Sequence, residues 1–140
     1  MKLNLTKDIC FFDVEATGLN ILRDRIVQLG VIKIKADGSP DETLNLLINP
    51  GMVFISQEAY EVHGISAKDV SNKPTFDKLA QQIYDFFGDA DLAGYNSNRF
   101  DIPMLMEEFA RAGVDFNIES RRLIDVQRIF YKMEPRTLAA

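Results

Sequence analysis

Two carboxylates spaced two residues apart, Asp13 and Glu15, interrupt the most strand-like run near the start of the chain. Residues 9–14 are mostly apolar, β-branched or aromatic, which predicts a buried strand. Side chains two apart on a strand share a face, so both acids should stand side by side near the interior, where Thr17 and Gly18 end the strand. Buried carboxylates need a compensating cation, and a divalent metal is the simplest one. The alternative is a strand end whose acids simply face solvent.

A third acid, Asp101, follows a polar stretch from Gly94 to Arg99 that opens a predicted helix. It falls in the first helical turn, where the helix dipole favours a negative charge. One interpretation is therefore a first-turn acid that only stabilises its helix. The polar tip before the helix favours the other interpretation, a third site residue.

The elements that position these acids are predicted from hydrophobic periodicity. Alternating apolar residues predict an antiparallel meander of three strands, at 9–14, 25–35 and 42–48. Helical spacing predicts three helices, at 56–64, 75–87 and 100–112, with Ser56 and Thr75 as N-caps. Short strands near 91–96 and 123–125 return through helical crossovers and should join in parallel, with a last helix to about residue 132. This order predicts an α/β fold, a mixed five-stranded sheet with helices on both faces.

The composition is that of one ordinary globular domain, residues 1–140, with 46% hydrophobic and 26% charged residues. The net charge of −5 argues mildly against non-specific nucleic-acid binding over the whole surface. Cys10 is the only cysteine, which excludes an intramolecular disulfide and is typical of the reducing cytoplasm. The first eight residues do not resemble a signal peptide, and no apolar run approaches the roughly 18 residues of a membrane span. Glycine patterns of nucleotide cofactor sites are also missing from the sequence.

Two segments around the three acids resemble motifs of the DEDD 3′–5′ exonucleases. Phe12 to Leu19 is similar to the first exonuclease motif, and Tyr95 to Asp101 with Leu105 is similar to the second. Between them, the turn from Val62 to Ile65 also recurs in the branch that contains the DNA polymerase III epsilon subunit and RNase T. The resemblance extends from Asp8 to Thr137 and implies a ribonuclease-H-like exonuclease domain.

The resemblance also implies catalysis with two Mg²⁺ or Mn²⁺ ions, which are hard cations that prefer oxygen ligands. Asp13 would bridge both ions, Glu15 would bind the ion that activates water, and Asp101 would hold the second ion. Further residues are expected to contact the terminal nucleotide or support the second motif: Thr17, Gly18, Leu19, Asn96 and Phe100.

The third motif of the family has no counterpart in the sequence. In the family it supplies a histidine general base followed five residues later by a carboxylate, or in a sister branch a tyrosine four residues before an aspartate. The only histidine, His63, is followed at that place by Lys68, and Tyr131 is followed by Pro135. We expect the general base and the fourth acidic ligand beyond Ala140, in a domain that is C-terminally incomplete. A general base contributes roughly 10²–10⁴-fold, so the 140 residues alone should be weak or inactive.

Two other polar residues are interpreted as structural. His63, in a Val-His-Gly-Ile turn, is expected to form structural hydrogen bonds rather than transfer protons. Asp125 matches a recurrent family aspartate but lies too early for the missing ligand, so we expect it to be structural or a helix cap.

The leading hypothesis is an exonuclease that releases nucleoside 5′-monophosphates from the 3′ ends of single-stranded DNA or RNA. A DNA polymerase subunit is a further candidate partner, and no membrane is involved. A non-catalytic nucleic-acid-binding or polymerase-associated module on the same fold remains open. A third hypothesis is a metal-dependent phosphatase of small molecules, which would show no preference for polymer ends.

Overall fold

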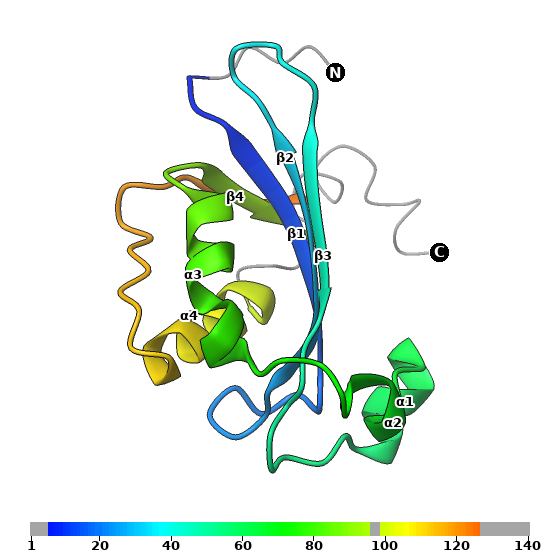
Figure 1. Ribbon diagram of the computed structural model, residues 1–140. Helices are drawn as coiled ribbons and strands as arrows, with labels where there is room; N and C mark the ends of the chain where they lie inside the picture. The colour runs from blue at the N-terminus through cyan, green and yellow to red at the C-terminus, as the bar shows by residue number, and fades with distance from the viewer. Residues whose placement is uncertain (1–5, 96–98, 127–140) are drawn as a thin grey trace.

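One five-stranded sheet with the strand order β3-β2-β1-β4-β5 forms the centre of the computed structural model, which describes residues 6–95 and 99–126. Its strands are β1 (Ile9–Ala16), β2 (Ile26–Ile34), β3 (Glu42–Leu47), β4 (Asp91–Gly94) and β5 (Leu123–Asp125). The strand that carries Asp13 and Glu15 is therefore the middle one (Figure 1).

Strand pairing follows the predicted mixture of directions. β1 pairs antiparallel with β2 along its whole length, and β2 pairs antiparallel with β3. β4 pairs parallel with both β1 and β5. The β1–β4 pairing covers only Ile9 to Phe11, because β4 ends at Gly94. Beyond Phe11, this edge of β1 pairs with no strand in the described part of the chain.

The two faces of the sheet differ in what covers them. Even-numbered residues of β1, from Cys10 to Ala16, point into the main core and are 6% exposed or less. Two helices, α3 (Phe76–Phe87) and α4 (Asp101–Arg111), cover this face in Figure 1. Phe12 meets Phe87 of α3 edge to face, with ring centroids 5.6 Å apart. Odd-numbered residues of β1 point to the opposite face, so Asp13 and Glu15 lie away from these helices.

Two short helices, α1 (Gln57–His63) and α2 (Ala67–Val70), lie at one end of the sheet, toward the face opposite to α3 and α4 (Figure 1). α1 is confirmed with its predicted ends: the Ser56 hydroxyl accepts a hydrogen bond from the Ala59 amide at 3.1 Å, and Gly64 adopts a left-handed conformation with φ 70°. No helix in the described residues is long and apolar enough to cross a membrane.

The helix α2 was not predicted, because its four residues are too few to show periodicity. Its signal is a capping box, in which Ser66 and Asp69 each accept a hydrogen bond from the other's backbone amide. Val70 of α2 packs with Val27 and Ile65 in a small second core.

Several helix and strand ends differ by one or two residues from the predicted ends. β1 continues two residues further to Ala16, while β4 stops two residues earlier, at Gly94. α4 begins one residue later, at Asp101. Thr75 is the N-cap residue of α3, as predicted, but its hydroxyl donates to the Asp77 carboxylate and makes no capping hydrogen bond to the helix backbone. The helix predicted to about residue 132 lies outside the described residues.

A closed turn follows β1 and returns the chain to β2. The buried Thr17 hydroxyl donates to Asp24 Oδ1 at 2.8 Å and accepts from the Arg25 amide at 3.0 Å. The other carboxylate oxygen of Asp24 accepts from the Asn20 amide at 2.8 Å. Gly18 lies against this carboxylate, since a Cβ at Gly18 would come within 2.5 Å of Asp24 Oδ2. Only glycine leaves room for the closed turn.

We predict that Gly18→Ala destabilises the protein by roughly 1–3 kcal/mol, because the methyl group must displace a buried, hydrogen-bonded carboxylate. Urea unfolding measures the loss. Gly30→Ala is the matched control, since a Cβ at Gly30 meets no described atom within 4 Å. Equal stability losses in the two variants would contradict the steric role of Gly18.

Candidate active site

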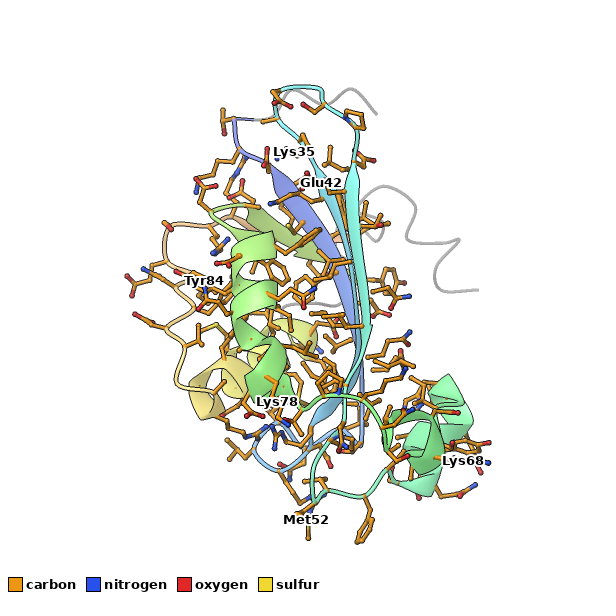
Figure 2. The ribbon with its side chains drawn as sticks, in the orientation of Figure 1. Lys35, Glu42, Met52, Lys68, Lys78 and Tyr84 are labelled. Carbon is orange, nitrogen blue, oxygen red and sulfur yellow. The ribbon has the colours of Figure 1, made fainter. Side chains whose placement is uncertain are left out.

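A groove of about 620 Å³ lies on the open face of the sheet and contains the first two acids. Its floor is formed by neighbouring strands: Phe11, Asp13 and Glu15 of β1, Gln28, Gly30 and Ile32 of β2, and Thr43 and Asn45 of β3. Gly94 and Tyr95 line the side where β4 ends. In Figure 2, Tyr84 of α3 marks the covered side of the sheet, opposite to this groove.

Asp13 and Glu15 share this open face, as their spacing predicts. Their predicted interior position is wrong for Asp13, which is exposed at the groove surface, while Glu15 is half-buried. The surrounding protein still excludes some water: partial burial raises the pKa of Asp13. Burial and the negative charge of Asp13 together raise the pKa of Glu15. The charge of Asp13 therefore disfavours the charged form of Glu15.

Asp101 is the buried acid of the site, with 6% of the residue exposed. As the first residue of α4 it lies at the positive end of the helix dipole. A hydrogen bond with the backbone of Val14 favours its ionised form. The effect of burial, which raises the pKa, is larger than the effect of this hydrogen bond. The negative charges of Asp13 and Glu15 act in the same direction as burial, and the pKa of Asp101 rises to about 7. The third acid is thus coupled electrostatically to the first two.

The three acids suit a divalent cation in chemistry and in charge. Asp101 Oδ2 is buried and has no hydrogen-bond partner among the described residues. In the same part of the chain, no salt bridge involves any of the three acids, although five other ion pairs are present. No group of three His, Cys, Asp or Glu side chains in residues 6–95 and 99–126 lies close enough together to hold a metal ion, so the three acids must draw together to share one. Without a cation, the charge of Asp13 raises the pKa of Glu15, and the charges of Asp13 and Glu15 both raise the pKa of Asp101.

The residues predicted to contact the nucleotide differ in how exposed they are and in what they contact. Leu19 is 85% exposed, as an apolar nucleotide contact requires. Thr17 is fully buried and its hydroxyl is bonded within the turn, so a hydroxyl contact with a nucleotide is not supported. Gly18 packs against Asp24, and Phe100 is half-buried beside the main core. Asn96 lies outside the described residues.

His63 connects α1 to the end of β1. One ring nitrogen, Nε2, lies 3.0 Å from the Ala16 carbonyl oxygen, and the other, Nδ1, accepts from the Ile65 amide at 3.0 Å. These contacts require a neutral ring that carries its proton on Nε2. With both nitrogens bonded to backbone, His63 has the structural role that the sequence predicts.

Sequence reasoning missed a buried acid, Glu108, at the far side of the site. It is 1% exposed, and its carboxylate accepts from the Ile26 amide at 2.8 Å and from Arg25 Nε at 2.9 Å. The available signal was its position seven residues after Asp101, on the same face of one helix. Asp125, expected to be structural, is buried at the end of β5, and its charge is a small further cause of the raised pKa of Asp101.

Comparison with known proteins places this arrangement in a family. The family described as "Exonuclease", of RNase T type, matches residues 10–140. The chain belongs to this exonuclease family. A DNA polymerase III subunit epsilon from Buchnera aphidicola is 27% identical over 140 residues, covering 95% of the chain and 59% of that protein. The corresponding subunit from Rickettsia conorii is 35% identical over 101 residues, covering 70% of the chain and 42% of that protein.

Solved structures of exonuclease I share the fold. A product-bound exonuclease I superposes with a TM-score of 0.80 at 22% identity, over 94% of the chain and 33% of the exonuclease I chain. The Escherichia coli enzyme in complex with a dT13 oligonucleotide gives a TM-score of 0.79. The predicted ribonuclease-H-like fold is therefore confirmed. The chain spans about a third of exonuclease I and a little over half of the Buchnera protein.

We predict that Asp101→Asn stabilises the metal-free protein, and more so as the pH rises. The folded state keeps a proton on Asp101 up to a pKa of about 7, whereas the unfolded chain releases it near its ordinary value of 3.8. Wild-type stability should therefore fall as the pH rises between these values. The advantage of the Asn variant should grow by roughly 2 kcal/mol from pH 5 to pH 8.

Urea unfolding in EDTA at the two pH values measures this difference. Asp85→Asn, which removes an exposed acid of α3, controls for the loss of one negative charge. An Asp101→Asn advantage that shrinks toward pH 8 would contradict the raised pKa of Asp101.

Proposed function

We propose that this protein is a metal-dependent 3′–5′ exonuclease that hydrolyses phosphodiester bonds at the ends of single-stranded DNA or RNA and releases nucleoside 5′-monophosphates. The observation that carries the proposal is the buried Oδ2 of Asp101, which has no hydrogen-bond partner in residues 6–95 and 99–126, coupled to Asp13 and Glu15 beside an open groove. Three oxygen-ligand side chains with excess negative charge are the ligands that Mg²⁺ and Mn²⁺ prefer.

Each acid has a distinct place in this function. Asp13, which lines the groove, would contact both ions, Glu15 would contact the ion beside the attacking water, and Asp101 would hold the other. Bound ions would supply a nucleophile near neutral pH and neutralise charge on the scissile phosphate. Asp101 must first lose the proton that its raised pKa retains, so metal binding should release a proton from this residue.

The open groove suits an extended polymer end rather than an enclosed small molecule. Its floor spans three strands and carries both apolar and polar side chains, such as Phe11, Ile32 and Asn45. Exposed Leu19 lies on the turn that follows Glu15, where it can pack against an unstacked terminal base. Base stacking on apolar and aromatic side chains is tolerant of sequence, as an exonuclease requires.

The general base is not assigned to a described residue. His63 is bonded to backbone through both ring nitrogens, so a proton transfer there would break the link between α1 and β1. The lack of an assigned general base among the described residues favours the second candidate for the 140 residues by themselves. This candidate is a nucleic-acid-binding or polymerase-associated module. The relatives named as DNA polymerase III subunits support association with a replicative polymerase in the cytoplasm as part of the proposal.

We predict that the natural-length protein with Mn²⁺ shortens 5′-labelled single-stranded DNA or RNA from the 3′ end. Asp13→Asn should lower the rate by at least about 100-fold, because it removes a charged ligand while keeping the side-chain shape. Asp85→Asn, on the opposite face of the sheet, should cleave like wild type. Products resolved by length on a gel provide the measurement. An intact substrate with the wild-type protein would favour the binding module, and internal cuts would contradict an exonuclease.

We also predict that Mn²⁺ raises the unfolding temperature of this chain more at pH 7.5 than at pH 5.5. At the lower pH, Asp101, whose pKa is raised to about 7, keeps a proton that it must lose before it binds a cation. At a metal concentration of 100 times its dissociation constant, the gain is about 2.7 kcal/mol. Calorimetry of wild type and Asp13→Asn measures it. The same Mn²⁺ effect in both proteins would place the metal elsewhere.

A further inference from the structure

Glu108 joins three parts of the molecule that border the candidate site. Its Oε2 accepts from the Ile26 amide at 2.8 Å, where β2 begins. Its Oε1 is bound by Arg25, with Nε at 2.9 Å and a terminal nitrogen at 2.8 Å. Arg111, one turn further along α4, lies 3.6 Å from the same oxygen. A 1% exposed carboxylate thus fixes α4 to the start of β2.

The position of Glu108 on α4 relates it directly to Asp101. Seven residues make nearly two full helical turns, so the two side chains lie on the same face, about 10 Å apart along the axis. Ile26, which Glu108 binds, is the β-sheet partner of Ala16, next to Glu15. Because Glu108 is bound at Ile26, both the rotation of α4 about its own axis and its position along that axis are fixed relative to β1.

Arg111 extends the same connection to the turn after β1. It donates to the carbonyl oxygens of Ile21, Leu22 and Asp24 at 3.0 to 3.2 Å. Asp24 in turn closes the Thr17 hydrogen bond. The turn that carries Gly18 and Leu19 is consequently fastened to the helix that carries Asp101.

We infer that Glu108 is a positioning residue, which holds α4, and with it Asp101, against the end of β1 that carries Asp13 and Glu15. The inference rests on the proposed function. Buried ion pairs are poor sources of net stability, because desolvation offsets their attraction, and their best-attested use is to fix the register between elements. Glu108 has the contacts for such a register role, whereas its distance from Asp101 keeps it out of the ligand set.

The amide of Val14 reports where Asp101 lies, independently of metal and of activity. Val14 lies beyond the short β1–β4 pairing, and its backbone hydrogen-bonds to the carboxylate of Asp101 as well as to that of Asp13. Its hydrogen exchange therefore depends on the position of α4. Cys10, in the part of β1 that pairs with both β2 and β4, serves as the internal reference for global opening.

The test compares Glu108→Gln with Asp91→Asn by amide hydrogen exchange in the metal-free protein. Asp91 is a matched control: it is 2% exposed and likewise accepts from one backbone amide at 2.8 Å and one Arg Nε at 2.9 Å, both of Arg122. It lies at the opposite end of the β1–β4 pairing, in register with Ile9. Both substitutions keep an acceptor and remove one buried charge.

We expect Glu108→Gln to raise the ratio of the Val14 to the Cys10 exchange rate by about tenfold, the equivalent of losing one hydrogen bond. Asp91→Asn should leave this ratio within about twofold of wild type. A Glu108→Gln ratio that matches wild type or Asp91→Asn overturns the positioning role. Arg25→Lys, which keeps the charge but loses the two-pronged contact, provides the same test if Glu108→Gln does not fold.

Metal binding and cleavage by the natural-length protein complete the test. Positioning predicts that Glu108→Gln weakens Mn²⁺ binding by about tenfold or more and lowers kcat with little change in KM, while Asp91→Asn does neither. If wild type neither binds Mn²⁺ nor cleaves, the proposed function fails, and the Val14 exchange ratio still decides whether Glu108 positions Asp101.

Discussion

The short pairing between β1 and β4 is the constraint on which the candidate site depends. β4 covers β1 only as far as Phe11, and this leaves the backbone of Val14 available to a partner that is not a strand. The first residue of α4 takes that place. If β4 continued alongside β1, Asp101 could not reach this edge, and the helix would begin further from the two acids on the open face.

Burial and negative charge together raise the pKa of Asp101 at the edge of β1 beyond Phe11. Asp101 is buried where a carboxylate is costly, and the helix dipole and one backbone hydrogen bond only partly compensate for that cost. Asp13 and Glu15 increase the cost, because they have the same sign and face the same groove. The remainder of the fold, from the aromatic contacts under β1 to the buried Glu108, supplies the stability that keeps the three acids in place.

The parts of this arrangement that depend on local periodicity could be predicted from the sequence. A period of two places Asp13 and Glu15 on one face, and alternating apolar runs predict the central strands to within two residues. Contacts that leave no periodic pattern in the sequence, whether local or between distant segments, could not be predicted in this way. The Thr17 hydroxyl bonds within its own turn instead of remaining free for a nucleotide, and the capping box of α2 is too short to show a pattern. Glu108 resembles an ordinary surface acid in the sequence, and only packing against Arg25 reveals its burial.

The spacing of Asp101 and Glu108 on α4 has a consequence for how this family can vary in length. Inserting or deleting one residue between them would turn one side chain by about 100° relative to the other, so that both could not meet their partners on the sheet. The irregular segment between α4 and β5 has no such angular requirement, and loops tolerate changes in length far better than packed elements do. Length changes among homologues should therefore be found after Arg111 and be absent from the two turns that precede it.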